Sequence, residues 1–187
     1  PSQLIDPYGR RLTYLRISVT DRCNLRCLYC IPAQGIDKVK HDDILSYEEI
    51  IRVAGVAVKM GVNKIRITGG EPLVRKEIDS LLPRLAGLPG IKDLSLTTNG
   101  IYLKEHLWQI KSSGITRINI SLDTLNPQTY ERITGVDGFE KVWEAIGPAF
   151  AGVMAGQGAA EGHDQLLPLD RRSGDEDGWF DYRFNPL

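Results

Sequence analysis

Residues 64–72 read Lys64-Ile65-Arg66-Ile67-Thr68-Gly69-Gly70-Glu71-Pro72, an apolar, β-branched strand that ends in a glycine turn. A helical pattern follows at about 76–86, so the stretch predicts one strand–turn–helix unit. The unit recurs along the chain. Further strands are predicted at 15–20, 93–98 and 117–122, and further helices between Ser46 and Gly61, at 103–113 and at 139–146, with a short helix capped by Asn126-Pro127. Four such units predict an α/β fold with a parallel sheet, either open and doubly wound or part of a (β/α) barrel.

Four unusual segments lie at the predicted carboxyl ends of these strands. They are the cysteine loop after residue 20, Gly69-Gly70-Glu71-Pro72, Thr98-Asn99-Gly100 and Ser121-Leu122-Asp123. In parallel α/β folds, ligands bind at the edge where the strands end. The sequence therefore predicts one functional site at this edge.

All three cysteines of the chain stand within eight residues, at Cys23, Cys27 and Cys30. Clustered thiolates favour a soft metal centre, and a site with three protein ligands leaves one metal position open for chemistry. A [4Fe–4S] cluster is the favoured interpretation. The alternative is a zinc clip with His41 as fourth ligand, although closed zinc sites usually contain paired CxxC spacings.

Length and charge limit the classes of function. A chain of 187 residues is one domain by default, and 23 basic against 24 acidic side chains give a net charge of -1. This balance argues against nucleic acid and membrane surfaces as partners. No signal peptide, membrane-spanning run or disulfide framework is evident, so we expect a reducing, cytoplasmic location.

The composition changes sharply near Gly147. Residues 1–146 contain all 18 isoleucines and all nine lysines, whereas residues 147–187 contain neither and hold seven of the 19 glycines. We therefore expect a folded core at 1–146 and an irregular tail at 147–187. A natural flexible tail is one explanation, but a different coding frame or unrelated sequence from about Gly147 is the one we favour.

The cysteine loop, with Tyr29 before its last cysteine, and the Gly69-Gly70-Glu71-Pro72 segment one β–α unit later resemble the radical S-adenosylmethionine (SAM) superfamily. Their flanks resemble the GTP 3′,8-cyclase family of molybdenum cofactor biosynthesis, over about residues 4–146. The segments that carry this resemblance are Asp6-Pro7-Tyr8-Gly9-Arg10, Tyr14 to Asn24, Ile65 to Arg75, Leu96 to Gly100 and Arg117 to Thr124.

The resemblance implies a partial (β/α) barrel of the radical SAM type, with about four βα units. It also implies a lyase that converts GTP to (8S)-3′,8-cyclo-7,8-dihydroguanosine 5′-triphosphate. The implied cofactors are a [4Fe–4S] cluster and SAM, and the implied partners are GTP as substrate and an electron donor to the cluster. A homodimer is left open.

Individual residues take their roles from the same resemblance. The implied cluster ligands are Cys23, Cys27 and Cys30, and the implied SAM-binding residues are Tyr29, Gly69, Gly70 and Ser121. Each SAM-binding residue also has a plainer structural interpretation. Tyr29 could be a packing aromatic, the glycines could serve a tight turn, and the Ser121 hydroxyl could be a cap.

The implied GTP-binding residues are Arg16, Arg66 and Thr97. Each arginine lies in an apolar strand, where an unpaired guanidinium is costly to bury. Facing a polyanion would satisfy it, because the planar fork suits phosphate oxygens. A salt bridge at the strand surface is the alternative.

The resemblance stops before the family pattern is complete. Members carry a second [4Fe–4S] cluster bound by three further cysteines, whereas this chain has no cysteine after Cys30. We therefore expect a truncated core that binds SAM but turns over GTP poorly. The alternatives are another radical SAM enzyme and a non-catalytic fragment that binds a cluster or metal.

Overall fold

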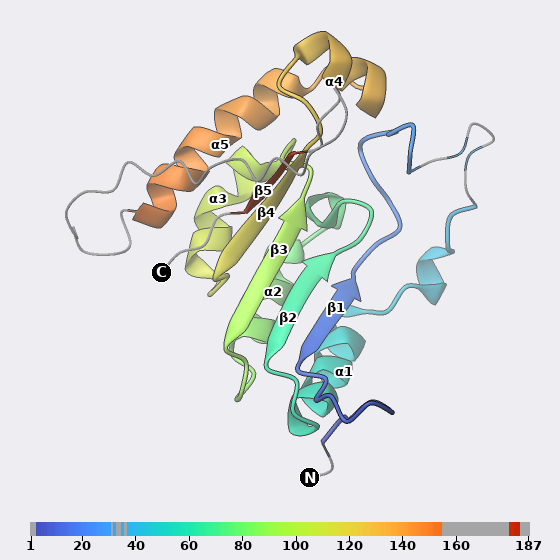
Figure 1. Ribbon diagram of the computed structural model, residues 1–187, viewed down its shortest axis with the longest axis vertical. Coiled ribbons are helices and arrows are strands. Elements are labelled where there is room, and N and C mark those ends of the chain that lie inside the picture. Colours follow the sequence, from blue (N-terminus) through green and yellow to red (C-terminus); the bar gives the residue numbers. More distant parts are fainter. Residues whose placement is uncertain (1–2, 31, 33–34, 36, 155–179, 184–187) are drawn as a thin grey trace.

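A computed structural model describes residues 3–30, 32, 35, 37–154 and 180–183, and its described residues form one sheet with helices (Figure 1). The strands are β1 (Tyr14–Ser18), β2 (Lys64–Thr68), β3 (Asp93–Thr98), β4 (Arg117–Leu122) and β5 (Phe180–Arg183). They lie in the order β1-β2-β3-β4-β5, and the first four are parallel. The predicted α/β class with four successive parallel strands is confirmed.

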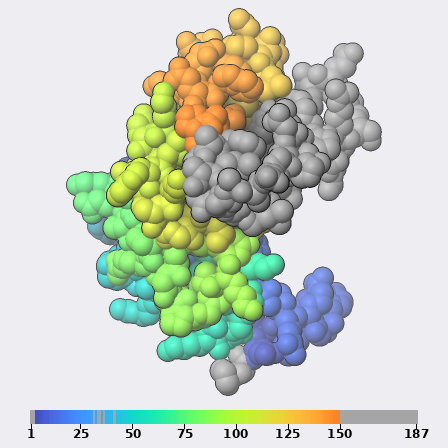
Figure 2. All heavy atoms as spheres, turned by 90° about the vertical axis from the view of Figure 1, so that its left-hand side faces the viewer, coloured from blue at the N-terminus to red at the C-terminus, as the bar shows by residue number. Residues whose placement is uncertain are grey.

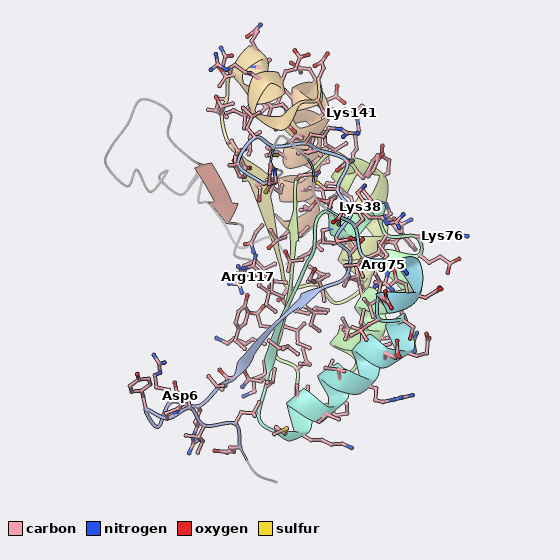
Figure 3. All side chains as sticks on the ribbon, turned by 90° about the vertical axis from the view of Figure 1, so that its right-hand side faces the viewer. Asp6, Lys38, Arg75, Lys76, Arg117 and Lys141 are labelled. Carbon is pink, nitrogen blue, oxygen red and sulfur yellow. The ribbon has the colours of Figure 1, made fainter. Side chains whose placement is uncertain are left out.

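The helices that follow the strands cover one face of the sheet (Figures 1 and 3). They are α1 (Tyr47–Lys59), α2 (Ile78–Ala86), α3 (Leu103–Ser112), α4 (Pro127–Thr134) and α5 (Phe139–Met154), with short 3₁₀ turns η1 (His41–Asp43) and η2 (Pro72–Val74). α3 and α5 pack against each other, as Figure 2 shows from the side. Helices on a single face are the arrangement of a (β/α) barrel wall, whereas a doubly wound sheet carries them on both faces.

The alternation of side chains along the strands explains this arrangement. Apolar residues of one face are buried under the helices, including Ile65, Ile67, Leu94, Leu96 and Ile120. The residues between them are mostly polar and face the other side. The sheet therefore has an apolar face that forms the core and a polar face that is left for other contacts.

Local capping fixes the helix starts that the sequence predicts. The Ser46 hydroxyl accepts from the Glu49 backbone N–H at 3.2 Å, and the Glu49 carboxylate accepts from the Ser46 backbone N–H at 2.7 Å. This reciprocal pair confirms the predicted capping box. Asn126 caps α4 in the same way, by accepting from Thr129 N–H at 2.8 Å.

The expectation of an irregular tail at 147–187 is wrong for two short segments. α5 continues through residues 147–154 to Met154, and residues 180–183 form β5, which pairs antiparallel with β4. Alanine is the strongest helix former, and Ala149 is buried on the same helix as Ala145, so packing extends the helix past the change in composition. Residues 155–179 and 184–187 of the expected tail lie outside the described residues, and the origin of the tail stays a prediction.

None of the helices in the described ranges has the length and apolar run that a bilayer crossing requires.

Candidate functional site

The four segments predicted to form the site follow the ends of four adjacent parallel strands. The cysteine loop follows β1, Gly69-Gly70-Glu71 follows β2, Asn99-Gly100 follows β3 and Asp123 follows β4. Their convergence at one edge of the sheet is confirmed by hydrogen bonds between the segments. Figure 1 shows this edge at the tips of the strand arrows.

The cysteine loop is held at its centre by α4. Arg26 N–H donates to the Thr134 carbonyl at 2.8 Å and Leu28 N–H donates to the Ile133 carbonyl at 2.9 Å. A turn then joins the Cys30 N–H to the Cys27 carbonyl at 2.9 Å. The backbone of the loop is therefore fixed by the fold before any ligand is added.

The three thiols differ in exposure. Cys27 is buried, Cys23 is half-buried and Cys30 is exposed, and all three are free. Burial raises the pKa of the Cys23 thiol above its usual range and raises the pKa of Cys27 to about 11. Both groups are protonated at neutral pH in the unliganded chain, so binding a metal centre must release their protons.

The donor set fits a cluster chemically. Three free thiols on one loop are the ligands that iron–sulfur clusters use. Beside Cys23, the side-chain Nδ2 of Asn24 is buried without a hydrogen-bond partner, and a sulfide or thiolate acceptor would satisfy it. Among the described residues, however, no group of three or more His, Cys, Asp or Glu side chains is gathered closely enough to hold a metal ion. The side chain of His41, the fourth ligand of the zinc alternative, lies outside the described part.

Gly69 and Gly70 bring the turn after β2 against the segment that leads into Cys23. Gly70 N–H donates to the Thr20 carbonyl at 2.6 Å, and Glu71 N–H donates to the Arg22 carbonyl at 2.8 Å. A Cβ at Gly69 would come within 2.6 Å of the Thr20 carbonyl oxygen, and one at Gly70 would overlap the Arg22 carbonyl. Both glycines are thus required by the packing of the chain itself, whatever they contact in a complex.

Glu71 connects this turn to the end of β3. Its carboxylate is 1% exposed and accepts from the Leu73 backbone N–H, the Thr98 hydroxyl and the Asn99 backbone N–H at 3.0, 2.8 and 2.6 Å. Burial raises the pKa of Glu71 above its ordinary value, although these donors act in the opposite direction. Sequence reasoning gave Glu71 no role, because only the fold brings the three donors to it.

Tyr29 connects the cysteine loop to the end of β4. Its hydroxyl donates to the Asp123 carboxylate at 2.8 Å, and the side chain is half exposed. Burial, together with this hydrogen bond, raises the pKa of Tyr29. Ser121, two residues before Asp123, is exposed near the end of β4. Tyr29 and Ser121 therefore lie at the same edge, as expected, and their contact with SAM stays a prediction.

The residues predicted to bind GTP lie on the polar face of the sheet. Arg16 is the register partner of Arg66 on the neighbouring strand, which places the two Cα atoms about 5 Å apart. Arg66 lies over the Tyr14 ring at 5.7 Å, and its Nε is buried without a hydrogen-bond partner. Thr97, one strand further, accepts from the Asn119 amide at 3.4 Å. Because Arg16 and Arg66 bring two positive charges to neighbouring positions of this face, a bound anion would stabilise it.

A third arginine, which was not predicted from the sequence, lies in the same row of the sheet. Arg117 is the register partner of Ser95, which is in turn the partner of Arg66. Its guanidinium forms an ion pair with Asp93 at 2.6 Å, and Figure 3 shows Arg117 on the side of the sheet away from the helices. The signal was available, because a strand period of two places residue 117 on the same face as Asn119.

Arg75, which follows the η2 turn, makes contacts within the fold. Its guanidinium donates to the Val19 and Leu45 carbonyls, both at 2.6 Å, and lies over the Tyr47 ring at 4.3 Å. Figure 3 shows its side chain among the elements on the helix side. Arg75 therefore secures the end of β1, directly before the cysteine loop.

This chain is similar to known proteins over most of its length. The profile of the radical SAM superfamily matches residues 17–149. A protein named GTP 3′,8-cyclase from Geobacter sulfurreducens is 53% identical over 149 residues, and one of the same name from Peptoclostridium acidaminophilum is 56% identical over 145 residues. These alignments cover 80% and 78% of this chain but 46% and 45% of the relatives, so the chain spans about half their length.

Solved structures also resemble this chain. SuiB from Streptococcus suis, in a crystal structure with S-adenosylmethionine bound, superposes with a TM-score of 0.58 at 27% identity, over 74% of this chain and 32% of SuiB. HydG, a maturase of the [FeFe]-hydrogenase, superposes with a TM-score of 0.59 over 74% of this chain and 32% of its own. At 16% identity, the likeness to HydG supports the fold alone.

Proposed function

The chain belongs to the radical SAM superfamily, and from that membership we propose that it forms the SAM-binding part of a GTP 3′,8-cyclase. The reaction would convert GTP to (8S)-3′,8-cyclo-7,8-dihydroguanosine 5′-triphosphate on the route to the molybdenum cofactor. The observation that carries the proposal is the placement of the cysteine loop at the edge of a sheet whose polar face presents opposed arginines. The names of relatives about 50% identical over this region point to the same substrate.

In this proposal, Cys23, Cys27 and Cys30 ligate a [4Fe–4S] cluster that, with SAM bound, supplies radical chemistry. The protein positions the reactants. The loop backbone is already fixed by α4 and by the turn after β2, so little ordering remains when the cofactor binds. Tyr29, within the loop, and Ser121, near the end of β4, would contact the adenine and ribose of SAM, and Gly69 and Gly70 would approach its methionine group.

The polar face would bind the substrate. Arg16 and Arg66 lie opposite each other, and the unpaired Nε of Arg66 leaves a donor for a phosphate oxygen. Thr97 extends this row toward the end of β3, nearer the cysteine loop. GTP would then lie with its phosphates over the arginines and its nucleoside toward the loop, where hydrogen abstraction must occur.

Turnover by this chain alone is proposed to be impaired. The chain covers 46% and 45% of the two relatives named GTP 3′,8-cyclase. The second candidate function is therefore cluster and SAM binding without cyclisation of GTP. An external electron donor, a homodimer and a cytoplasmic location remain predictions.

Anaerobic reconstitution with iron and sulfide tests the proposal. We expect close to four irons per chain, an electron paramagnetic resonance signal of the reduced cluster that changes when SAM is added, and release of 5′-deoxyadenosine. Loss of iron in Cys23→Ser, Cys27→Ser and Cys30→Ser variants would confirm the ligands. Zinc bound in place of iron after reconstitution would contradict the proposal.

The substrate is tested separately. In Arg16→Ala and Arg66→Ala variants, we expect weaker GTP binding with SAM binding unchanged, because the two arginines lie on the polar face. Arg84→Ala is the matched control, since Arg84 pairs with Glu48 on the helix side. Formation of the cyclised nucleotide would distinguish the complete reaction from cofactor binding alone. Equal loss of GTP binding in all three variants would overturn the assignment.

A further inference from the structure

The sulfur of Cys23 accepts two N–H groups. The Leu25 backbone N–H donates to Cys23 Sγ at 3.4 Å, and the side-chain Nδ2 of Asn99 donates to the same atom at 3.7 Å. Both lie within hydrogen-bond range for sulfur. Leu25 belongs to the cysteine loop, whereas Asn99 comes from the end of β3, 76 positions away in the sequence. Asn99 is therefore a contact that the fold brings to the loop.

The orientation of the Asn99 amide is fixed by its neighbours. Its Oδ1 accepts from the Ile101 backbone N–H at 3.1 Å, which leaves Nδ2 to face the loop. There Nδ2 donates to Asn24 Oδ1 at 2.7 Å as well as to Cys23. Because the oxygen already has a backbone donor, a flipped amide would place two donors together, so this assignment is the consistent one.

The backbone of Asn99 is fixed as firmly as its side chain. The buried Glu71 carboxylate accepts its N–H at 2.6 Å and also accepts from Thr98, the preceding residue. Asn99 itself is 9% exposed. The turn after β2, the end of β3 and the cysteine loop are thus joined by one hydrogen-bond network. In this network Asn99 donates to the thiol of Cys23.

We propose that Asn99 is a positioning residue that holds Cys23 for the cluster and raises the reduction potential of that cluster through its N–H···S contact. The inference rests on the proposed cluster. A donor at a ligand sulfur stabilises negative charge, and the reduced cluster carries one more negative charge than the oxidised one. Hydrogen bonds to the sulfurs are one of the means by which a protein sets this potential.

Asn99→Asp is the sharpest variant, because it keeps the shape and the Oδ1 acceptor but replaces the donor with a negative oxygen. In the reconstituted full chain, we expect a shift of the cluster to a more negative midpoint potential in a redox titration followed by electron paramagnetic resonance. A tenfold fall in the ratio of reduced to oxidised cluster at a fixed potential corresponds to about 59 mV for one electron. Asn63→Asp is the matched control. It makes the same change just before β2, at the amino-terminal end of the strands and therefore away from the cysteine loop, so it should leave the potential unchanged.

The outcomes separate this inference from the proposed function. If the wild-type chain takes up no iron, both proposals are overturned. If the wild-type chain forms the cluster and Asn99→Asp retains the wild-type potential, the inference alone is overturned.

A measurement on the wild-type chain covers the case in which the variant does not fold. With ¹⁵N in the asparagine side chains, electron–nuclear double resonance of the reduced cluster should detect coupling to an amide nitrogen. The coupling should persist in Asn24→Asp, which removes the other side-chain amide beside Cys23 but keeps the Oδ1 that accepts from Asn99. Absence of that coupling would overturn the inference without any substitution.

Discussion

At the scale of single residues, the carboxylate of Glu71 illustrates how a buried charge is tolerated beside the proposed cluster site. Three neutral donors from Leu73, Thr98 and Asn99 compensate the charge, while the lost hydration acts against it. Burial has the larger effect and raises the pKa of Glu71. The same group therefore connects three segments and makes their stability depend on pH.

Glu71→Gln should lower the free energy of unfolding by about 1–3 kcal/mol, because the amide cannot accept all three donors. The difference from wild type should shrink as the pH rises. A raised pKa in the folded state means that the folded chain keeps its proton longer than the unfolded chain, so stability is lost as the pH rises through the folded pKa. Urea unfolding of both proteins between pH 4.5 and 8 checks this.

Glu48→Gln is the control for that prediction, because the difference between this variant and wild type should change with pH in the opposite direction. The hydrogen bond from Arg84 lowers the pKa of Glu48, so its contribution is lost as the pH falls. A difference between wild type and Glu71→Gln that grows toward high pH would contradict the assignment of burial as the dominant cause.

Arg75→Lys should lower the free energy of unfolding by about 1–2 kcal/mol. A lysine has no planar fork, so it cannot donate to the Val19 and Leu45 carbonyls while lying over Tyr47. Arg52→Lys, on the exposed side of α1, should change stability by less than about 0.5 kcal/mol. Equal unfolding midpoints for the two variants in urea would show that the contacts of Arg75 do not contribute to stability.

At the scale of secondary-structure elements, local signals were sufficient for most of the fold. β2, β3 and β4 begin and end at the predicted residues, and the capping box at Ser46 starts α1 as expected. These signals depend on neighbours in the sequence, namely periodicity and side-chain caps. β5 could not be predicted, because its partner strand β4 lies about 60 residues earlier in the chain.

For the candidate site too, some features could be predicted from the sequence and others could not. The sequence placed Cys23, Arg66 and Tyr29 at the correct edge or face, because strand order and period determine both. It did not give the contacts of Glu71 and Asn99, since these join segments that are distant in the sequence. Motif spacing predicts which residues come together at the site. Which of them donate and accept hydrogen bonds to one another is known only from the folded structure.

Gly70→Ala should destabilise the protein by more than about 3 kcal/mol, because the added Cβ would overlap the Arg22 carbonyl and separate the turn after β2 from the cysteine loop. Gly55→Ala is the matched control with opposite sign. In the interior of α1 its Cβ would meet only the Leu88 side chain, at 4.0 Å, so helix propensity should stabilise the protein by about 0.5–1 kcal/mol. Thermal unfolding of both variants checks the contrast, and a mild effect at Gly70 would contradict the close approach.

At the scale of the whole molecule, the sheet has one face under helices and one polar face with arginines. Among the four parallel strands, the two outer ones, β1 and β4, each have a neighbour on one side only. β5 pairs with β4 along four register positions, from Asn119 to Leu122, and so covers the outer side of β4. Unpaired strand edges promote association between chains, so this pairing has consequences for solubility.

Deletion of residues 155–187 should therefore increase self-association, because it removes β5 and leaves the backbone groups of β4 without partners. Sedimentation velocity at two protein concentrations checks this against the full chain, and we expect larger species whose proportion rises with concentration. Deletion of residues 184–187 alone keeps β5 and serves as the control. If both shortened chains sediment like the full chain, β5 does not protect this edge, and a different segment or a second copy of the chain must cover β4 in solution.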